Sequence, residues 1–282
     1  MSVNSLVSIR PAVLERADDH FVLTAFDSAL PYLASIGSGA QWGSVPFTSK
    51  PSVVKDMHDF LLRSDRIHAL EEAEAQKTHD AGAVARRVFE AEGSSGRKQW
   101  NKLIVAEVST GDQLAVRVAA IGLASHAPGY VQSSLPSEFS GSTKMKASPR
   151  SQGSGGSVTD TADDEGVEGG RPFLYVNYLI SHRDPLSLAN DSATASASAS
   201  ASSISALGKG AGEALLKDTI SQARNLGVST IFVDCWAGNG GGLVRYYERQ
   251  GFTPLGTFDV PDKHGPGLPW TGMLLKMDLD HS

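Results

Sequence analysis

The stretch LGKGAGEALLKDTISQARNLGVSTIFVDCWAGNGGGLVRYYERQGF, residues 207–252, carries the clearest structural pattern in the chain. It predicts a glycine-rich turn, a helix, a buried strand and a second helix that ends at Gly251 and Phe252. The β-branched and aromatic run at 230–233 is typical of a central strand. The first helix is indicated by Gly227 as its stop and by apolar residues at three- and four-residue steps: Ala211, Leu215, Leu216, Ile220, Ala223 and Leu226.

Three glycines, Gly208, Gly210 and Gly212, open directly into this helix. Residues without a Cβ let the backbone approach a ligand closely, and the free N–H groups of a helix start form an anion site. The segment therefore predicts a pyrophosphate site, although a tight turn without a ligand would have the same composition.

Two nucleotide-binding motifs can be compared with this spacing. A P-loop requires Ser or Thr after Gly-Lys, and here Lys209 is followed by Gly210, which excludes it. A dinucleotide fingerprint requires a strand just before the glycines. Ala/Ser repeats stand there instead, so this alternative is disfavoured, although Asp234 lies at a plausible distance downstream.

Taken together, the motifs of this stretch resemble the core of the GCN5-related N-acetyltransferase (GNAT) family. The family pattern is Arg/Gln-x-x-Gly-x-Gly/Ala, followed by Asn and a Tyr-x-x-x-Gly-Phe helix end. The two glycines fall on Gly210 and Gly212, the Asn on Asn239 and the tyrosine on Tyr247. The resemblance implies an α+β fold, with helices on both faces of a mixed, mostly antiparallel twisted sheet whose central parallel strands are splayed.

The rest of the chain supplies the elements that such a fold needs, and we expect a single domain over residues 1–282. Strands are expected at 5–13, 102–108, 114–123, 173–181, 253–260 and 272–279, and helices at 15–36 and 50–62. Three stretches are expected to be disordered or exposed inserts. One is charged with few core anchors (66–99), and two are rich in small polar residues (133–171 and 185–206).

The resemblance implies acetyl-CoA as the acyl donor and assigns residues to it. Leu179, Ile180 and Ser181 lie on the strand that would pair with the pantetheine arm. Asn239 would also bind the cofactor. The pyrophosphate would be held by the loop residues Leu207, Gly208, Lys209, Gly210, Ala211 and Gly212. Leu207 stands where the family has Arg or Gln, and Lys209 is a replacement donor. Asn239 and Tyr247 are eight residues apart instead of the usual seven.

The resemblance also implies that Tyr247 acts as the general acid that protonates the departing thiolate; the alternative is a partly buried structural aromatic, a role that suits Tyr246 better. Glu107, Asp234 and His182 lie on or beside strands of the expected cleft, but no motif singles one out as the base. The other histidines lack metal-ligand spacing, so no metal is expected.

Composition limits the partners. A net charge of −6 gives no basic footprint for nucleic acid. The single Cys235 excludes a disulfide framework and fits a reducing compartment. No leader and no apolar run of about 18 residues is evident, so a soluble, cytoplasmic protein without a membrane partner is expected. The acceptor pocket is expected to be shaped by the Trp42 loop and by the loop at 261–270, which carries His264 and Trp270; Trp42 could instead only pin its loop.

The preferred hypothesis is an acetyl-CoA-dependent N-acetyltransferase in which a small-molecule amine, or another amino group, attacks the thioester directly in a ternary complex. An alternative is an acyl-CoA-binding module of the same fold with weak or lost turnover. A dinucleotide-binding oxidoreductase is disfavoured by the order of the elements.

Overall fold

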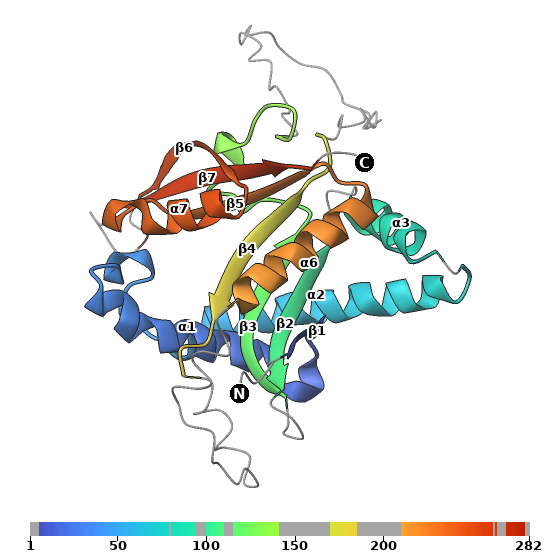
Figure 1. Cartoon of the computed structure of the whole chain (residues 1–282), viewed down its shortest axis with the longest axis horizontal. Coiled ribbons are helices and arrows are strands. Elements are labelled where there is room, and N and C mark those ends of the chain that lie inside the picture. Colours follow the sequence, from blue (N-terminus) through green and yellow to red (C-terminus); the bar gives the residue numbers. More distant parts are fainter. Residues whose placement is uncertain are drawn as a thin grey trace, which may run out of the picture.

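The structure, a computed structural model, describes residues 6–78, 80–93, 100–109, 115–140, 170–184, 210–261, 263 and 269–279. Its centre is a seven-stranded sheet with the order β1-β2-β3-β4-β5-β7-β6 (Figure 1). The strands are β1 (Leu6–Pro11), β2 (Asn101–Ser109), β3 (Val116–Ala124), β4 (Leu174–Ser181), β5 (Thr230–Trp236), β6 (Thr253–Val260) and β7 (Trp270–Asp278). The helices are α1 (Asp18–Ser35), α2 (Pro51–Ala75), α3 (Ala81–Gly93), α6 (Ala211–Leu226) and α7 (Gly242–Arg249).

All neighbouring strands are antiparallel except β4 and β5, which are parallel at the centre of the sheet. Helices cover both faces (Figure 1). Because strand residues alternate between faces, Ile104 and Ala106 of β2 pack in the core with α6, whereas Leu103 and Val105 pack in the core with α1. The predicted fold class, a mixed and mostly antiparallel sheet between helices, is confirmed.

Most predicted elements lie where the periodicity placed them. α1 is continuous across Pro31. α6 ends at Gly227, whose φ of 72° closes the helix in the left-handed region that favours glycine. Within the described residues, no helix is long and apolar enough to cross a membrane.

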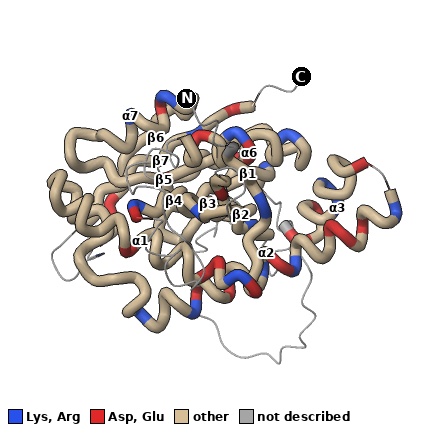
Figure 2. Tube along the Cα trace, turned by 60° about the horizontal axis from the view of Figure 1, so that its bottom comes forward, with Lys and Arg blue, Asp and Glu red and all other residues tan. Residues whose placement is uncertain are grey.

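The prediction of an exposed insertion at 66–99 is wrong for its helical parts. α2 continues to Ala75 and is followed by α3, and Ile67, Val88 and Phe89 are buried in the core shared with α6. Charged residues occur along both α2 and α3 (Figure 2), and several of them are exposed, as Glu72, Arg86 and Glu90 are. Several pair there, as Arg66 does with Glu92 at 2.8 Å. Few apolar positions therefore suffice to dock α3. Residue 79 and residues 94–99 lie outside the described residues.

The first residues of the insert predicted at 133–171 pack against the sheet. Leu135 and Phe139 are buried, and the Phe139 ring meets Phe232 at 5.0 Å and Phe173 at 5.9 Å between centroids. Residues 133–140 therefore cover one face of the sheet near β5. The remainder of that stretch, 141–169, and the predicted insert 185–206 lie outside the described residues.

Packing of α3 can be tested with Phe89→Ala. Phe89 is 5% exposed and its ring packs edge-on against Trp100 at 5.3 Å. Removing such a ring should cost about 3–5 kcal/mol in the free energy of unfolding by urea, because a cavity remains in the core. Leu62→Ala, at a position that is 45% exposed on α2, is the control and should change stability by about 0.5 kcal/mol or less. Equal effects of the two changes would show that α3 is not part of the core.

Candidate active site

β4 and β5 separate midway along their length. They pair at Leu174–Ile231, Tyr175–Phe232 and Val176–Val233 and not beyond, although β4 continues to Ser181. The edge of residues 177–181 that faces β5 therefore has no strand partner. This is the splay that the family resemblance implied.

A bulge lies at the point of separation. Gly122 of β3 pairs with Tyr178, and the next residue of β3, Leu123, pairs with Val176. Asn177 is therefore an extra residue in β4. A bulge bends its strand and increases the local twist, which turns the end of β4 away from β5. Gly122 accommodates the Tyr178 ring, since a Cβ at Gly122 would lie 2.5 Å from that ring.

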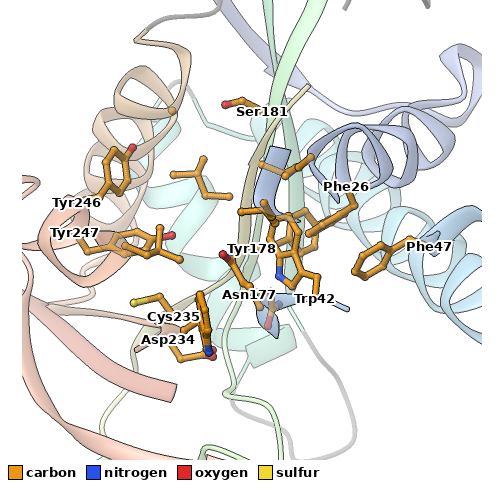
Figure 3. A pocket seen from close by; sticks show the side chains of 18 of the residues that line it. Phe26, Trp42, Phe47, Asn177, Tyr178, Ser181, Asp234, Cys235, Tyr246 and Tyr247 are labelled. Carbon is orange, nitrogen blue, oxygen red and sulfur yellow. The ribbon is translucent and has the colours of Figure 1, made fainter. Parts of the chain in front are cut away.

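A cavity of about 770 Å³ occupies the gap between the two strands and is lined from both faces of the sheet. Tyr246 and Tyr247 of α7 line it on one side of β4, while Phe26, Trp42 and Phe47 line it on the other (Figure 3). Leu179, Ile180 and Ser181, the β4 residues assigned to the cofactor, also line it. A ligand in the gap is therefore accessible from both faces. We call the side of α6 and α7 the helix side, and the side of Phe26, Trp42 and Phe47 the aromatic side.

The start of α6 opens into the helix side. Gly210 precedes the helix with φ of 96°, a conformation that favours glycine, and no side chain caps the first turn. Among the described residues, Ala214 is the first whose N–H bonds back, to the Gly210 carbonyl at 2.9 Å. Within the described part of the chain, the N–H groups of residues 211–213 have no helical partner, as expected for a helix start that can receive an anion.

The predicted loop residues divide into three groups. Gly210 and Gly212 line the cavity, and a Cβ at Gly212 would make a tight contact of 3.1 Å with the Tyr246 hydroxyl. The Ala211 side chain is buried in the core, so only its backbone can serve a ligand. Leu207, Gly208 and Lys209 lie outside the described residues.

Tyr247, the predicted acid, is 5% exposed and lines the cavity. Its ring is held edge-on by Tyr246 at 5.2 Å and by Phe252 at 5.6 Å. Its side chain extends from α7 toward β4 (Figure 3). Burial raises the pKa of Tyr247 well above its ordinary value, so the hydroxyl stays protonated and can donate a hydrogen bond.

Asn239, which the sequence assigned to the cofactor, makes its side-chain hydrogen bonds with the end of α1 and the loop after it. Its side-chain Nδ2 donates to the Ile36 carbonyl at 2.8 Å and to Ser38 Oγ at 2.6 Å, and Asn239 is not among the residues that line the cavity. The turn around Gly240 and Gly241, both with positive φ, carries its side chain toward the end of α1. The amide that was assigned to the cofactor is thus used to hold the loop after α1.

Two of the three base candidates lie elsewhere. Glu107 is buried in ion pairs with Arg10 at 2.8 Å and Arg16 at 2.6 Å. His182 is buried against Phe21, and its Nδ1 accepts the Asp184 N–H at 3.1 Å. Burial lowers the pKa of His182. Neither Glu107 nor His182 lines the cavity.

Asp234, on β5 just beyond the separation, does line the cavity. The hydroxyls of Tyr175 and, at 3.4 Å, Tyr130 donate to its Oδ1. Burial raises the pKa of Asp234, and the two hydroxyls and the charge of Lys263 oppose this rise only in part. A carboxylate in this state takes up a proton more readily than one in water.

Residues from both stretches expected to shape the acceptor pocket line the cavity, namely Trp42 from the first and Lys263 and Trp270 from the second. Trp42 packs edge-on against Phe26 at 4.9 Å, and Trp270 donates from Nε1 to the Gln41 carbonyl at 3.1 Å. His264 lies outside the described residues. Sequence reasoning missed Phe47 and Tyr178. Their contributions depend on long-range packing and on the β4 bulge, which leave no local signal.

No group of three or more His, Cys, Asp or Glu side chains that could hold a metal ion occurs in the described part of the chain.

Comparison with known proteins was made at the levels of sequence and structure. No protein-family profile matches the chain, and no curated protein sequence matches it. Solved N-acetyltransferase structures do resemble it. One is an N-acetyltransferase from Staphylococcus aureus, with 14% identity over 98% of this chain and 99% of that one and a TM-score of 0.45.

Two further structures are similar to the same extent. YncA from Salmonella typhimurium, a proposed acetyltransferase whose structure contains its cofactor acetyl-CoA, has 13% identity over 98% of this chain and 95% of its own, with a TM-score of 0.45. A ribosomal-protein-alanine N-acetyltransferase from Brucella melitensis has 14% identity over 96% and 99%, with a TM-score of 0.44. With TM-scores below 0.5, the likeness is loose, and the chemistry of this chain must be derived from its own residues.

The raised pKa of Asp234 predicts that Asp234→Asn increases the stability of the folded chain, by an amount that depends on pH. The folded chain holds this proton more tightly than the unfolded chain, so ionised Asp234 lowers stability at pH values above the ordinary 3.8. Asp234→Asn should therefore raise the melting temperature at pH 7, and the gain should vanish as the pH falls below 3.8.

Asp59→Asn is the control of opposite sign, because a hydrogen bond from Lys55 lowers the pKa of Asp59. Asp59→Asn should not raise the melting temperature at pH 7. A loss of stability in Asp234→Asn at pH 7 would contradict the assigned direction.

Proposed function

We propose that the chain is an acetyl-CoA-dependent N-acetyltransferase that passes the acetyl group directly to an amine in a ternary complex. The observation that carries this proposal is the gap between β4 and β5, which joins an anion site on the helix side to an aromatic chamber on the aromatic side. Direct transfer requires two substrates to meet at one carbonyl group. A gap open to both faces of a sheet lets each enter from its own side.

The chain offers a site for each part of the cofactor on the helix side. The free edge of residues 179–181 can pair with the amide groups of an extended pantetheine arm as an added strand would. The N–H groups of residues 211–213 at the start of α6 suit a pyrophosphate. Leu207, Gly208 and Lys209 precede that start in the sequence and remain predicted cofactor ligands.

Bound acetyl-CoA would supply the thioester carbonyl that the amine attacks. A backbone N–H on the free edge of β4 would stabilise the negative charge that develops on the carbonyl oxygen. Tyr247 would donate its hydroxyl proton toward the departing sulfur. Since an alkyl ammonium has an ordinary pKa near 10, the acceptor must also lose a proton. Asp234, the carboxylate with a raised pKa in the cavity, is placed to take it directly or through water.

The acceptor side has a mixed character. Phe26, Trp42 and Phe47 form an apolar wall, while Asp234 lies at the edge of the gap. We infer an acceptor in which an amino group is carried on an apolar body, either a small molecule or a protein amino group.

Cofactor choice is tested by calorimetry with acetyl-CoA, CoA and NAD. Both CoA species should bind and NAD should not, because the site is built for an extended arm and a pyrophosphate on one helix start. No binding of either CoA species would refute the proposal. Binding without amine-dependent release of free thiol would identify an acyl-CoA-binding module that has lost turnover.

The role of Tyr247 is tested with Tyr247→Phe, which keeps the ring and removes the donor. Turnover should fall by roughly 10²–10⁴-fold, while the Kd for CoA changes by about twofold or less. Tyr246→Phe, at the adjacent ring on the same helix, is the control and should retain most of the turnover. Equal turnover in Tyr247→Phe and the unaltered chain would remove Tyr247 from the mechanism.

A further inference from the structure

A lysine of the chain itself, Lys263, lines the cavity where the proposed acceptor would bind. Lys263 Nζ lies 3.6 Å from the centroid of the Trp270 ring and 5.1 Å from that of Tyr130. All three residues line the cavity. An ammonium over an indole and a phenol ring is attracted by the negative faces of both. The two rings thus form part of a cation site.

Asp234 supplies the negative charge of this site. Both tyrosine hydroxyls, from Tyr175 and Tyr130, donate to Oδ1 of Asp234. Among the described residues, Oδ2 is therefore the oxygen that remains for a further donor. The charges of Asp234 and Lys263 act on each other, since Lys263 lowers the pKa of Asp234 and Asp234 raises that of Lys263. Together the two rings and the carboxylate have the composition of an ammonium site.

The cluster lies on the face where an acceptor would arrive. Along β5, Val233 and Cys235 pack into the core of α6 and α7, whereas Phe232 packs on the opposite face with Tyr175. Asp234 is two residues beyond Phe232 and shares its face. An ammonium held there would approach the gap from the side opposite Tyr247 and the start of α6.

The site is held in place without Lys263. Trp270 is 4% exposed and is fixed by its hydrogen bond to the Gln41 carbonyl, and Tyr130 is held by its hydroxyl bond to Asp234. Lys263 itself is exposed as a residue, while desolvation of its ammonium end lowers its pKa. Because its flexible stem is exposed, Lys263 can swing into solvent, and another ammonium can take its place.

We propose that Tyr130, Trp270 and Asp234 form the subsite that binds the acceptor as a primary alkylammonium ion, and that Lys263 fills this subsite in the free protein as an internal competitor. The assignment to the acceptor rests on the proposed acetyl transfer. The existence of the ammonium site does not, because it follows from the ring and carboxylate geometry.

The site can be emptied and refilled. Lys263→Ala deletes a propylammonium group, so n-propylammonium is the matched probe and 1-propanol its neutral counterpart. In calorimetry, n-propylammonium should bind Lys263→Ala about tenfold more tightly than it binds the unaltered chain, and about tenfold more tightly than 1-propanol does. Adding Asp234→Asn to Lys263→Ala should remove most of this preference.

Lys50→Ala is the matched control, because Lys50 lines the same cavity with its Nζ 4.4 Å from the Phe47 ring centroid. It should gain no affinity for n-propylammonium. Equal binding of the amine and the alcohol by Lys263→Ala, or equal amine binding with and without Lys263, would overturn the proposal.

Transfer kinetics test the link to the acceptor. For a primary amine that the chain acetylates, Lys263→Ala should lower KM about tenfold while the Kd for acetyl-CoA stays unchanged, because the competitor is gone. Lys263→Met, which keeps an apolar stem without the charge, should lower KM in the same direction and serves if the alanine variant fails to fold. An unchanged or higher KM in these variants would overturn the competitor role. If Lys263→Ala binds n-propylammonium but the chain binds no CoA, the ammonium site stands and the proposed acetyl transfer falls.

Discussion

The separation of β4 from β5 beyond Val176 and Val233 is the constraint on which the rest of this structure depends. A strand edge in the interior of a sheet leaves backbone N–H and C=O groups without partners, and such groups are costly unless something satisfies them. The bulge at Asn177, with Gly122 giving room to the Tyr178 ring, maintains the separation. An extended ligand with amide groups of its own would satisfy that edge. The gap is thus a structural cost that the proposed cofactor binding would offset.

The two sides of the gap are braced by different parts of the chain. On the helix side, Gly212 allows Tyr246 to pack against the first turn of α6, which brings α7 and Tyr247 close to β4. On the aromatic side, the loop after α1 is tied down twice, by Asn239 at Ile36 and Ser38 and by Trp270 at Gln41. The wall that carries Trp42 is therefore fixed by residues that follow β5. The shape of the aromatic side therefore depends on Asn239 and Trp270 being correctly folded in the C-terminal half of the chain.

The features that could be predicted from the sequence are those that local physics determines. Periodicity located α1, α6 and the strands, Gly227 marked a helix end by its backbone conformation, and the spacing of Tyr247 to Gly251 placed the tyrosine that lines the cavity. Features set by distant partners were missed. The charges of α3 concealed a helix that docks through few apolar residues such as Val88 and Phe89. The positive-φ turn that begins at Asn239 directs its side chain to the end of α1. Asp234 could be named but not singled out, because its pKa depends on Tyr175, Tyr130 and Lys263.

Hydrogen exchange along β4 tests the central claim most directly. If the free edge of β4 pairs with the pantetheine arm, acetyl-CoA should slow amide exchange in the peptide that spans residues 177–183 and in the first turn of α6, because both gain hydrogen-bond partners. Strand β6, at the far edge of the sheet, should exchange at the same rate with and without the ligand. Unchanged exchange in residues 177–183 at saturating acetyl-CoA would contradict the assignment of the gap as the cofactor site.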